Sequence, residues 1–201
     1  MKILCGLGNP GAQYEQNRHN IGFLVLDALA ARWKLSFSST KFDSELASGS
    51  FAGDKVLLIK PQLFMNRSGI SLGQAARFYK VPAPDVMVIH DELDLPFAKL
   101  QLKQGGGSGG HNGLNSIRES WGEDQYVRLR FGIGKPVRHP SPSPQGASGP
   151  GAKERVVGHV LGDFSSEERP ALPELIGKSC DIAESWARDG LAKAMNRWNG
   201  K

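Results

Sequence analysis

A histidine and an aspartate, far apart in the chain, could together activate a water molecule. His19 stands just before a predicted helix, and Asp91 follows the apolar run at residues 86–89. A carboxylate that holds one imidazole nitrogen fixes the tautomer and stabilises the imidazolium, so the other nitrogen can accept a proton. The sequence leaves open whether these side chains meet. A lone histidine at a helix start is more often structural, and the aspartate could equally be a capping or loop residue.

Three asparagines, Asn9, Asn66 and Asn112, each follow or begin a predicted element. A carboxamide both donates to and accepts from a peptide backbone, so three that converge would suit a substrate with amide groups. Phe64 and Met65 directly precede the second asparagine. In the simpler structural interpretation, Asn66 caps a helix while the aromatic and thioether side chains belong to the core.

A glycine-rich segment, residues 105–113, is the most distinctive local feature of the chain. It reads GGGSGGHNG and stands between a predicted strand and a predicted helix. Such a segment lets the backbone approach a ligand, and its N–H groups can hold an anion at the start of the next helix. It lacks the Gly-Lys-Ser/Thr ending of a nucleotide triphosphate loop. Its final His111 and Asn112 favour a functional loop over a linker.

Three basic side chains are predicted to lie close to this segment. Lys103 belongs to a predicted strand over residues 100–103, and Arg128 and Arg130 alternate with apolar residues along a strand over 126–132. We expect all three to lie on the solvent faces of these strands. Most exposed charges only solvate a surface, but beside a glycine loop these three could bind a phosphate.

The segment GLGNPG, residues 6–11, matches the G-x-G-x-x-G pattern of dinucleotide-binding proteins. We reject that interpretation. Pro10 removes a backbone donor from the phosphate-binding turn, and no helical pattern begins directly after the last glycine. The acid expected about 20 positions later would be Asp27, which lies within a predicted helix rather than at a strand end. The segment is therefore predicted to be a tight turn that holds Asn9.

Strands and helices alternate along most of the chain, as in α/β proteins. Apolar runs and period-two patterns predict strands at residues 2–7, 44–51, 55–59, 86–89, 100–103, 126–132 and 156–161. Helical spacing predicts helices at residues 20–33, 66–79, 113–121 and from 170 to 198. We expect a single three-layer α/β/α domain over residues 1–201, with a central mixed, mostly parallel sheet and a long C-terminal helix. Residues 136–153, rich in proline, glycine and serine, are expected to form a flexible loop.

Length and composition narrow the class of protein. The 201 residues, 39% apolar and 22% charged, fit one globular domain. No apolar stretch approaches the ~18 residues of a membrane-spanning helix, and the first residues lack a secretory signal pattern, so we expect a cytoplasmic protein with no membrane partner. Two cysteines cannot build a disulfide scaffold or a four-cysteine zinc site. The net charge of +5 permits an anionic partner without proving one.

Taken together and in this order, the motifs resemble those of the bacterial peptidyl-tRNA hydrolase family. The matching segments are GLGNPG (6–11), RHNIGF (18–23), FMNRSG (64–69), HDELDLP (90–96), GGGSGGHNGL (105–114) and RLRFGIGKP (128–136). Each segment alone is weak, but the joint match is highly specific. After residue 136 the resemblance is thinner, and the segment after Arg138 is longer than is usual in the family.

The resemblance implies an enzyme without metal or cofactor, usually a monomer, that cleaves the ester between a peptide and the terminal ribose of tRNA. It implies that His19 is the catalytic base, that Asp91 stabilises the form able to accept a proton, and that Asn9 helps to distinguish blocked from unblocked aminoacyl-tRNA. Candidate substrate contacts, including the acceptor stem and 3′ end, are Tyr14, Phe64, Met65, Asn66, His111 and Asn112. Lys103 and Arg130 match the pair that binds the tRNA 5′-phosphate, with Arg128 adjacent.

Two other interpretations remain open at this point. A zinc hydrolase could use His19, His90, Asp91 and His111, although no His-x-x-x-His spacing supports it and consecutive strand residues point to opposite faces. A non-enzymatic RNA-binding module would also fit the positive charge. Release of an N-acetyl amino acid from its tRNA, measured with and without EDTA, separates the three.

Overall fold

The computed structural model describes residues 1–136 and 151–200. Its strands are β1 (Lys2–Gly6), β2 (Ser39–Lys41), β3 (Ser44–Phe51), β4 (Asp54–Pro61), β5 (Val86–Glu92), β6 (Leu100–Gln104) and β7 (Val127–Gly132). Its helices are α1 (Ile21–Arg32), α2 (Ser68–Tyr79), α3 (Asn112–Trp121), α4 (Ala152–Val160), α5 (Leu172–Asp189) and α6 (Leu191–Trp198). None of these helices is long and apolar enough to cross a membrane.

The strands form one mixed sheet in the order β2-β3-β4-β1-β5-β7-β6. The four central strands run parallel, with Leu4 of β1 paired to Leu58 of β4 and to Met87 of β5. Antiparallel strands complete both edges. Because parallel strands end at one edge of a sheet, β1, β4, β5 and β7 deliver the residues that follow them to the same place. The predicted three-layer α/β fold is confirmed.

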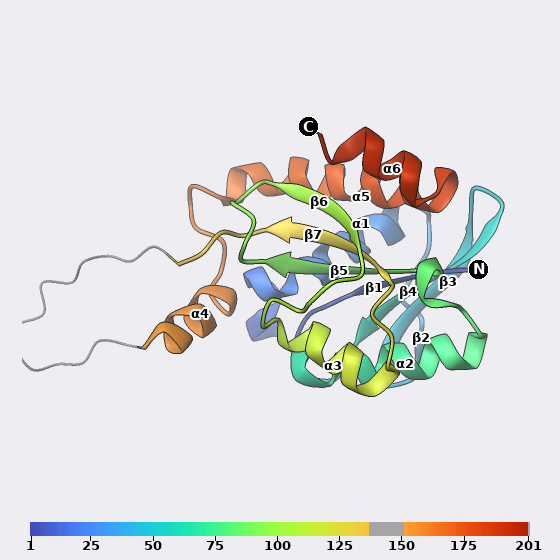
Figure 1. Ribbon diagram of the computed structural model, residues 1–201, viewed down its shortest axis with the longest axis horizontal. Helices are drawn as coiled ribbons and strands as arrows, with labels where there is room; N and C mark the ends of the chain where they lie inside the picture. Colours follow the sequence, from blue (N-terminus) through green and yellow to red (C-terminus); the bar gives the residue numbers. More distant parts are fainter. Residues whose placement is uncertain (137–150, 201) are drawn as a thin grey trace, which may run out of the picture.

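Two apolar layers hold the helices to the sheet, because side chains alternate between its faces. On one face, Leu4, Met87 and Leu129 are fully buried in a cluster that includes residues of α1 and α5. On the other face, Ile3 and Val88 are fully buried in a cluster that includes residues of α2 and α3. Figure 1 shows α5 and α6 above the sheet and α2 and α3 below it.

The segment predicted as a seventh strand at residues 156–161 is instead part of α4, so that prediction is wrong. The apolar residues Val156, Val157 and Val160 have the spacing i, i+1, i+4, which also fits one helix face. The helix begins at Ala152, so residues 152 and 153 of the predicted flexible loop are helical. Residues 137–150 of that loop lie outside the described part of the chain. Figure 1 shows α4 in orange beyond the ends of β5 and β7.

Two smaller differences from the sequence prediction concern the C-terminal helix and one edge strand. The long C-terminal helix is present, but Gly190, with φ of 83°, separates α5 from α6. Apolar spacing continues across this break, so the hydrophobic pattern gave no sign of it. The short edge strand β2 was not predicted, because all three of its residues are exposed and carry no apolar pattern.

Gly69 lets α2 and α3 cross closely. A Cβ built on Gly69 would lie 2.1 Å from the backbone oxygen of Ser116, and the Gly69 N–H donates to the Ser116 hydroxyl at 3.0 Å. Only glycine leaves room for this approach. The crossing places the 3-10 turn before α2, which carries Asn66, and the first residue of α3, Asn112, next to one cavity.

Replacing Gly69 with alanine should therefore push the helices apart. We expect Gly69→Ala to lower the free energy of unfolding, measured by urea denaturation, by about 1–3 kcal/mol. Gly177→Ala on α5 is the control, since a Cβ there meets only Arg32 Nη2 at 3.5 Å. That control should be neutral or stabilising by up to about 1 kcal/mol. Equal stability of the two variants would contradict the close crossing.

Candidate active site

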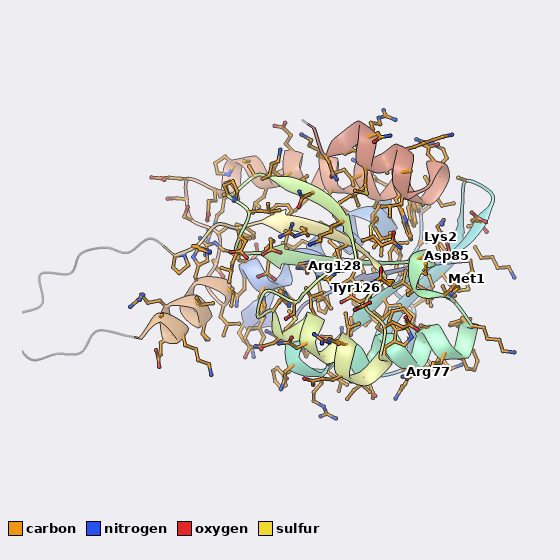
Figure 2. All side chains as sticks on the ribbon, in the orientation of Figure 1. Met1, Lys2, Arg77, Asp85, Tyr126 and Arg128 are labelled. Atoms are coloured by element: carbon orange, nitrogen blue, oxygen red, sulfur yellow. The ribbon has the colours of Figure 1, made fainter. Side chains whose placement is uncertain are left out.

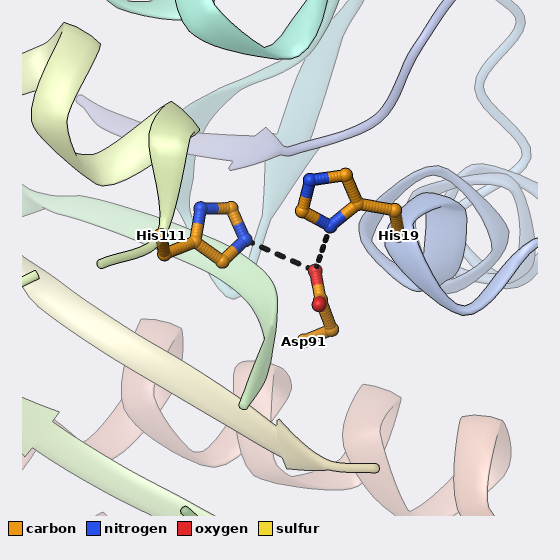
Figure 3. A group of neighbouring side chains, drawn as sticks. All are labelled: His19, Asp91 and His111. Carbon is orange, nitrogen blue, oxygen red and sulfur yellow. Dashed lines mark hydrogen bonds and ion pairs between the residues drawn. The ribbon is translucent and has the colours of Figure 1, made fainter. Parts of the chain in front are cut away.

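His19 and Asp91 meet at the edge of the sheet where the parallel strands end (Figure 3). A 3-10 turn, Arg18–Asn20, carries the histidine, and the aspartate is the second-last residue of β5. His19 Nδ1 lies 2.8 Å from Asp91 Oδ1, and the two residues are 7% and 2% exposed. An ionised carboxylate can only accept a hydrogen bond, so Nδ1 carries the proton. The lone pair of His19 is therefore on Nε2.

His111 donates to the same carboxylate oxygen. Its Nε2 lies 3.0 Å from Asp91 Oδ1, while its Nδ1 accepts the Gly113 backbone N–H at 3.1 Å. The Gly113 donor fixes the proton of His111 on Nε2. His111 is also the N-cap of α3. The sequence suggested His111 as a substrate contact, and its position at the end of a glycine loop was the only sign of this second role.

The two histidines set the charge of Asp91. Burial raises the pKa of the Asp91 carboxyl, but the charges and hydrogen bonds of His19 and His111 outweigh burial and hold that pKa well below its usual range. The carboxylate therefore stays ionised at any pH at which the protein would work. An ionised acid here keeps both imidazoles in the tautomers described above.

Asn9 is buried beside this group, and its backbone and side chain are both held. Its Oδ1 accepts the Met65 N–H at 2.8 Å, and its N–H and C=O exchange two hydrogen bonds of 2.9 Å with the Asn20 carboxamide. The turn after β1 thus holds Asn9 on stiff backbone, as the sequence predicted. Because the oxygen is occupied, Asn9 presents its side-chain N–H group to the cavity.

Two cavities meet at His19. The first, here called the carboxamide cavity, contains all three asparagines; its lining residues are Asn9, His19, Phe64, Met65, Asn66, Asn112, Val157, Val160 and Leu161. The second, here called the loop cavity, lies between residues 108–112 of the glycine loop, the end of β5 and the helix α4. Asn66 and Asn112 are exposed, and Asn66 lies within a 3-10 turn rather than at a helix cap. Tyr14 stands at the rim, with its ring edge-on to Phe64 at 6.4 Å.

Arg18 links the turn that carries His19 to the segment that follows α4. Its Nη1 donates to the backbone oxygens of His159 at 3.3 Å, Gly162 at 3.3 Å and Asp163 at 2.7 Å. Its Nη2 pairs with the carboxylate of Glu168 at 2.5 Å. The helix that covers both cavities is thus held from the residue next to the histidine.

The three basic side chains differ in exposure. Lys103 is exposed on β6, while Arg130 on β7 is half-buried and donates through Nε to Glu92 at 2.9 Å. Arg128 is only 4% exposed, so the expectation that it lies on a solvent face is wrong. The glycine loop folds over this part of β7, and its backbone oxygens need donors. Arg128 supplies them to Gly106 and Gly107 at 2.5 and 2.7 Å. Figure 2 labels Arg128 next to Tyr126.

Within the described residues, His19, Asp91 and His111 form the one group of three whose ligand atoms lie close enough for a metal, within 4.8 Å of one another. The hydrogen bonds argue against that use. A metal on His111 Nε2 would move the proton to Nδ1, where it would face the Gly113 N–H. His90, the fourth ligand of the zinc interpretation, is not in the group.

Known proteins match the chain over nearly its whole length. A family model described as peptidyl-tRNA hydrolase matches residues 3–201. The chain belongs to the peptidyl-tRNA hydrolase family. The peptidyl-tRNA hydrolase of Geotalea daltonii is 44% identical over 201 residues, covering 100% of this chain and 97% of that protein. That of Rhizobium rhizogenes is 48% identical over 197 residues, covering 98% and 76%. A crystal structure of peptidyl-tRNA hydrolase from Acinetobacter baumannii has a TM-score of 0.86 at 36% identity, covering 99% and 94% of the two chains.

Membership in the peptidyl-tRNA hydrolase family confirms the resemblance seen in the sequence. The family consists of enzymes, which favours a hydrolase over a non-catalytic RNA-binding module.

His90 is a second buried histidine, and it lies outside the group formed by His19, Asp91 and His111. Its Nδ1 donates to the Asp91 backbone oxygen at 2.7 Å, and its Nε2 is buried without a partner among the described residues. Its ring stands edge-on to His111 at 5.1 Å. Burial, reinforced by the charge of His111, lowers the pKa of His90 to about 3. The folded protein therefore holds this imidazole neutral.

That lowered pKa predicts a loss of stability in acid. Between pH 6.5 and about 3 the unfolded chain protonates His90 and the folded chain does not, so the free energy of unfolding falls as pH falls. Between pH 7 and pH 5 this group contributes up to about 2 kcal/mol of that fall. Urea denaturation at the two pH values should show a smaller fall for His90→Gln than for the wild type. An equal fall would show that His90 accepts its proton in the folded state.

Proposed function

We propose that this chain hydrolyses the ester between a peptide, or an N-blocked aminoacyl group, and the terminal ribose of tRNA. The observation that carries the proposal is the pair His19 and Asp91, whose free imidazole nitrogen belongs to a ring lining a cavity with three carboxamides. Family membership supports the same reaction class. We also propose that the protein is cytoplasmic and monomeric, as the resemblance implies.

In the first step, His19 Nε2 accepts a proton from water while the water oxygen attacks the ester carbonyl. Asp91 accepts the Nδ1–H throughout and stabilises the imidazolium that forms. When the tetrahedral intermediate collapses, the bond to the ribose oxygen breaks and the imidazolium returns its proton to that oxygen. General-base help of this kind is worth about 10²–10⁴ in rate. The ribose oxygen of an ester is a better leaving group than the nitrogen of an amide, so a water nucleophile suffices.

The carboxamides serve the acyl side of the substrate. Asn9 presents N–H donors because its oxygen is held by Met65, and it would bind a peptide carbonyl. Asn66 and Asn112 are exposed and can donate to the oxyanion that develops on the ester carbonyl. A free aminoacyl group has the ester carbonyl but not the peptide carbonyl. Asn9 could therefore favour substrates whose amino group is blocked.

The RNA side is assigned to the rim of the cavities and to the edge of the sheet. Phe64 is 57% exposed, and with Tyr14 it offers flat surfaces for the unpaired 3′ end. Lys103 and Arg130 lie near the glycine loop and would bind the 5′-phosphate, which fixes the position of the acceptor stem. Contacts of this kind read RNA shape and charge more than its sequence.

The decisive variant is His19→Ala. Loss of the base should reduce hydrolysis of N-acetyl-aminoacyl-tRNA by at least about 10²-fold, with tRNA affinity nearly unchanged. Release of the free N-acetyl amino acid measures the first quantity, and filter binding of deacylated tRNA measures the second. Retained turnover would remove His19 as the base.

The zinc interpretation is tested in the same assay. We expect wild-type hydrolysis to survive EDTA, because the Gly113 N–H keeps His111 in a tautomer that cannot bind a metal through Nε2. Activity lost to EDTA and restored by Zn²⁺ would replace the general-base mechanism with a metal-dependent one.

The phosphate contacts are tested by salt dependence. Lys103→Ala and Arg130→Ala should each weaken tRNA binding and reduce the slope of log affinity against log salt by about 1. Lys55→Ala is the control, because Lys55 is exposed near the start of β4, whereas the site lies where the parallel strands end. Unchanged slopes for the first two variants would place the phosphate site elsewhere.

A further inference from the structure

The glycine loop between β6 and α3 needs contacts from elsewhere to hold one conformation. Four of its glycines have positive φ; they are Gly105, Gly106, Gly109 and Gly110. Glycine populates this region freely, so a segment with so many glycines has much conformational entropy to lose. Its ordered shape therefore depends on the few side chains that grip its backbone.

Arg128 is the side chain that grips the middle of this loop. Its Nη1 and Nη2 donate to the backbone oxygens of Gly107 and Gly106 at 2.7 and 2.5 Å. A planar guanidinium suits two neighbouring acceptors, and hydrogen bonds from a charged donor are stronger than neutral ones. Arg128 is 4% exposed, and its guanidinium carbon Cζ lies 5.0 Å from the centre of the Tyr126 ring. Both terminal nitrogens of Arg128 thus already donate to backbone oxygens of the loop, so they are not available to a phosphate.

The far end of the same loop reaches the catalytic carboxylate. The His111 N–H donates to the Ser108 backbone oxygen at 3.0 Å, and His111 Nε2 donates to Asp91 at 3.0 Å. Gly107, held by Arg128, directly precedes the serine that helps to place His111. On the near side, a Cβ built on Gly106 would lie 2.8 Å from Lys103 Nζ, so the proposed phosphate-binding amine rests against the same turn.

We infer that Arg128 is a positioning residue that holds Gly106 and Gly107 so that His111 reaches Asp91, and not a ligand for the tRNA phosphate. This assignment rests on the proposed function for its kinetic consequences, but not for its structural ones. Without the grip of Arg128, the loop loosens and His111 withdraws from the shared oxygen for part of the time.

The test compares Arg128→Met and Arg128→Lys with the wild type. For Arg128→Met we expect kcat to fall about tenfold and KM to change less than about twofold, because the loop is mispositioned while the RNA contacts remain. The lysine variant keeps one charged donor and should recover part of kcat. The salt slope of tRNA binding should stay unchanged in both variants.

Arg118→Met is the matched control, because Arg118 is exposed on α3 and lines the same hollow as Gly106, Gly107 and Arg128. It should leave kcat as in the wild type. Amide hydrogen exchange across residues 105–111, measured in all variants, reads the loop without any substrate. Faster exchange in Arg128→Met and not in Arg118→Met supports the inference, even if the wild type proves unable to hydrolyse peptidyl-tRNA.

Two results would overturn the inference. The first is a salt slope reduced by about 1 with kcat and exchange unchanged, which would make Arg128 a phosphate ligand after all. The second is unchanged exchange across residues 105–111 in an Arg128→Met protein whose thermal unfolding matches the wild type. If Arg128→Met does not fold, the same two readouts apply to the lysine variant.

Discussion

The site depends on one buried charge, the carboxylate of Asp91. Moving an ionised carboxylate out of water costs several kcal/mol unless strong donors replace the lost hydration. Here two imidazoles donate to one oxygen, at 2.8 and 3.0 Å, and they come from different parts of the fold. The 3-10 turn before α1, the end of β5 and the start of α3 must therefore meet at one point. That requirement explains why the site lies at the carboxyl edge of the parallel strands, where all three segments begin or end.

The hydrogen bonds around this charge all point toward it. The Gly113 N–H donates to His111 Nδ1, which leaves His111 Nε2 to donate to Asp91, and His19 Nδ1 donates to the same oxygen. The Gly113 N–H fixes the proton of His111 on Nε2, and Asp91 fixes the proton of His19 on Nδ1, so the lone pair of His19 is on Nε2. A base poised in this way requires no rearrangement of the protein before it accepts a proton. The same direction makes the three residues poor metal ligands, although their atoms are close enough to hold one.

Most strands and helices follow from periodicity. The meeting of His19 with the end of β5 does not, because His19 lies on a 3-10 turn before α1 and not at the end of a parallel strand. The sequence could not show how loops cover the sheet. Alternation along β7 correctly put Arg128 and Arg130 on one face, yet only the fold shows that the glycine loop crosses Arg128 and leaves Lys103 exposed. The valines of α4 fit a strand as well as a helix, because six residues are too few to separate the two periods. The role of His111 depends on the Gly113 N–H, a backbone contact that residue types cannot reveal.

The residues beside His19 and Asp91 also determine what surrounds this pair. Arg18 precedes His19 and binds three backbone oxygens after the middle of α4, so the turn that places the base also anchors the helix that lines both cavities. The wall contributed by that helix is mostly apolar: Val157 and Val160 line both cavities, and Lys153 adds one charged side chain to the loop cavity. An apolar wall lowers the local dielectric constant, and each hydrogen bond to Asp91 is worth more there than in water. Arg18 and Arg128 thus act alike, since each uses a buried guanidinium to hold the backbone of a segment that has few apolar contacts of its own. The sheet fixes Asp91, and these two arginines fix the segments on either side of it.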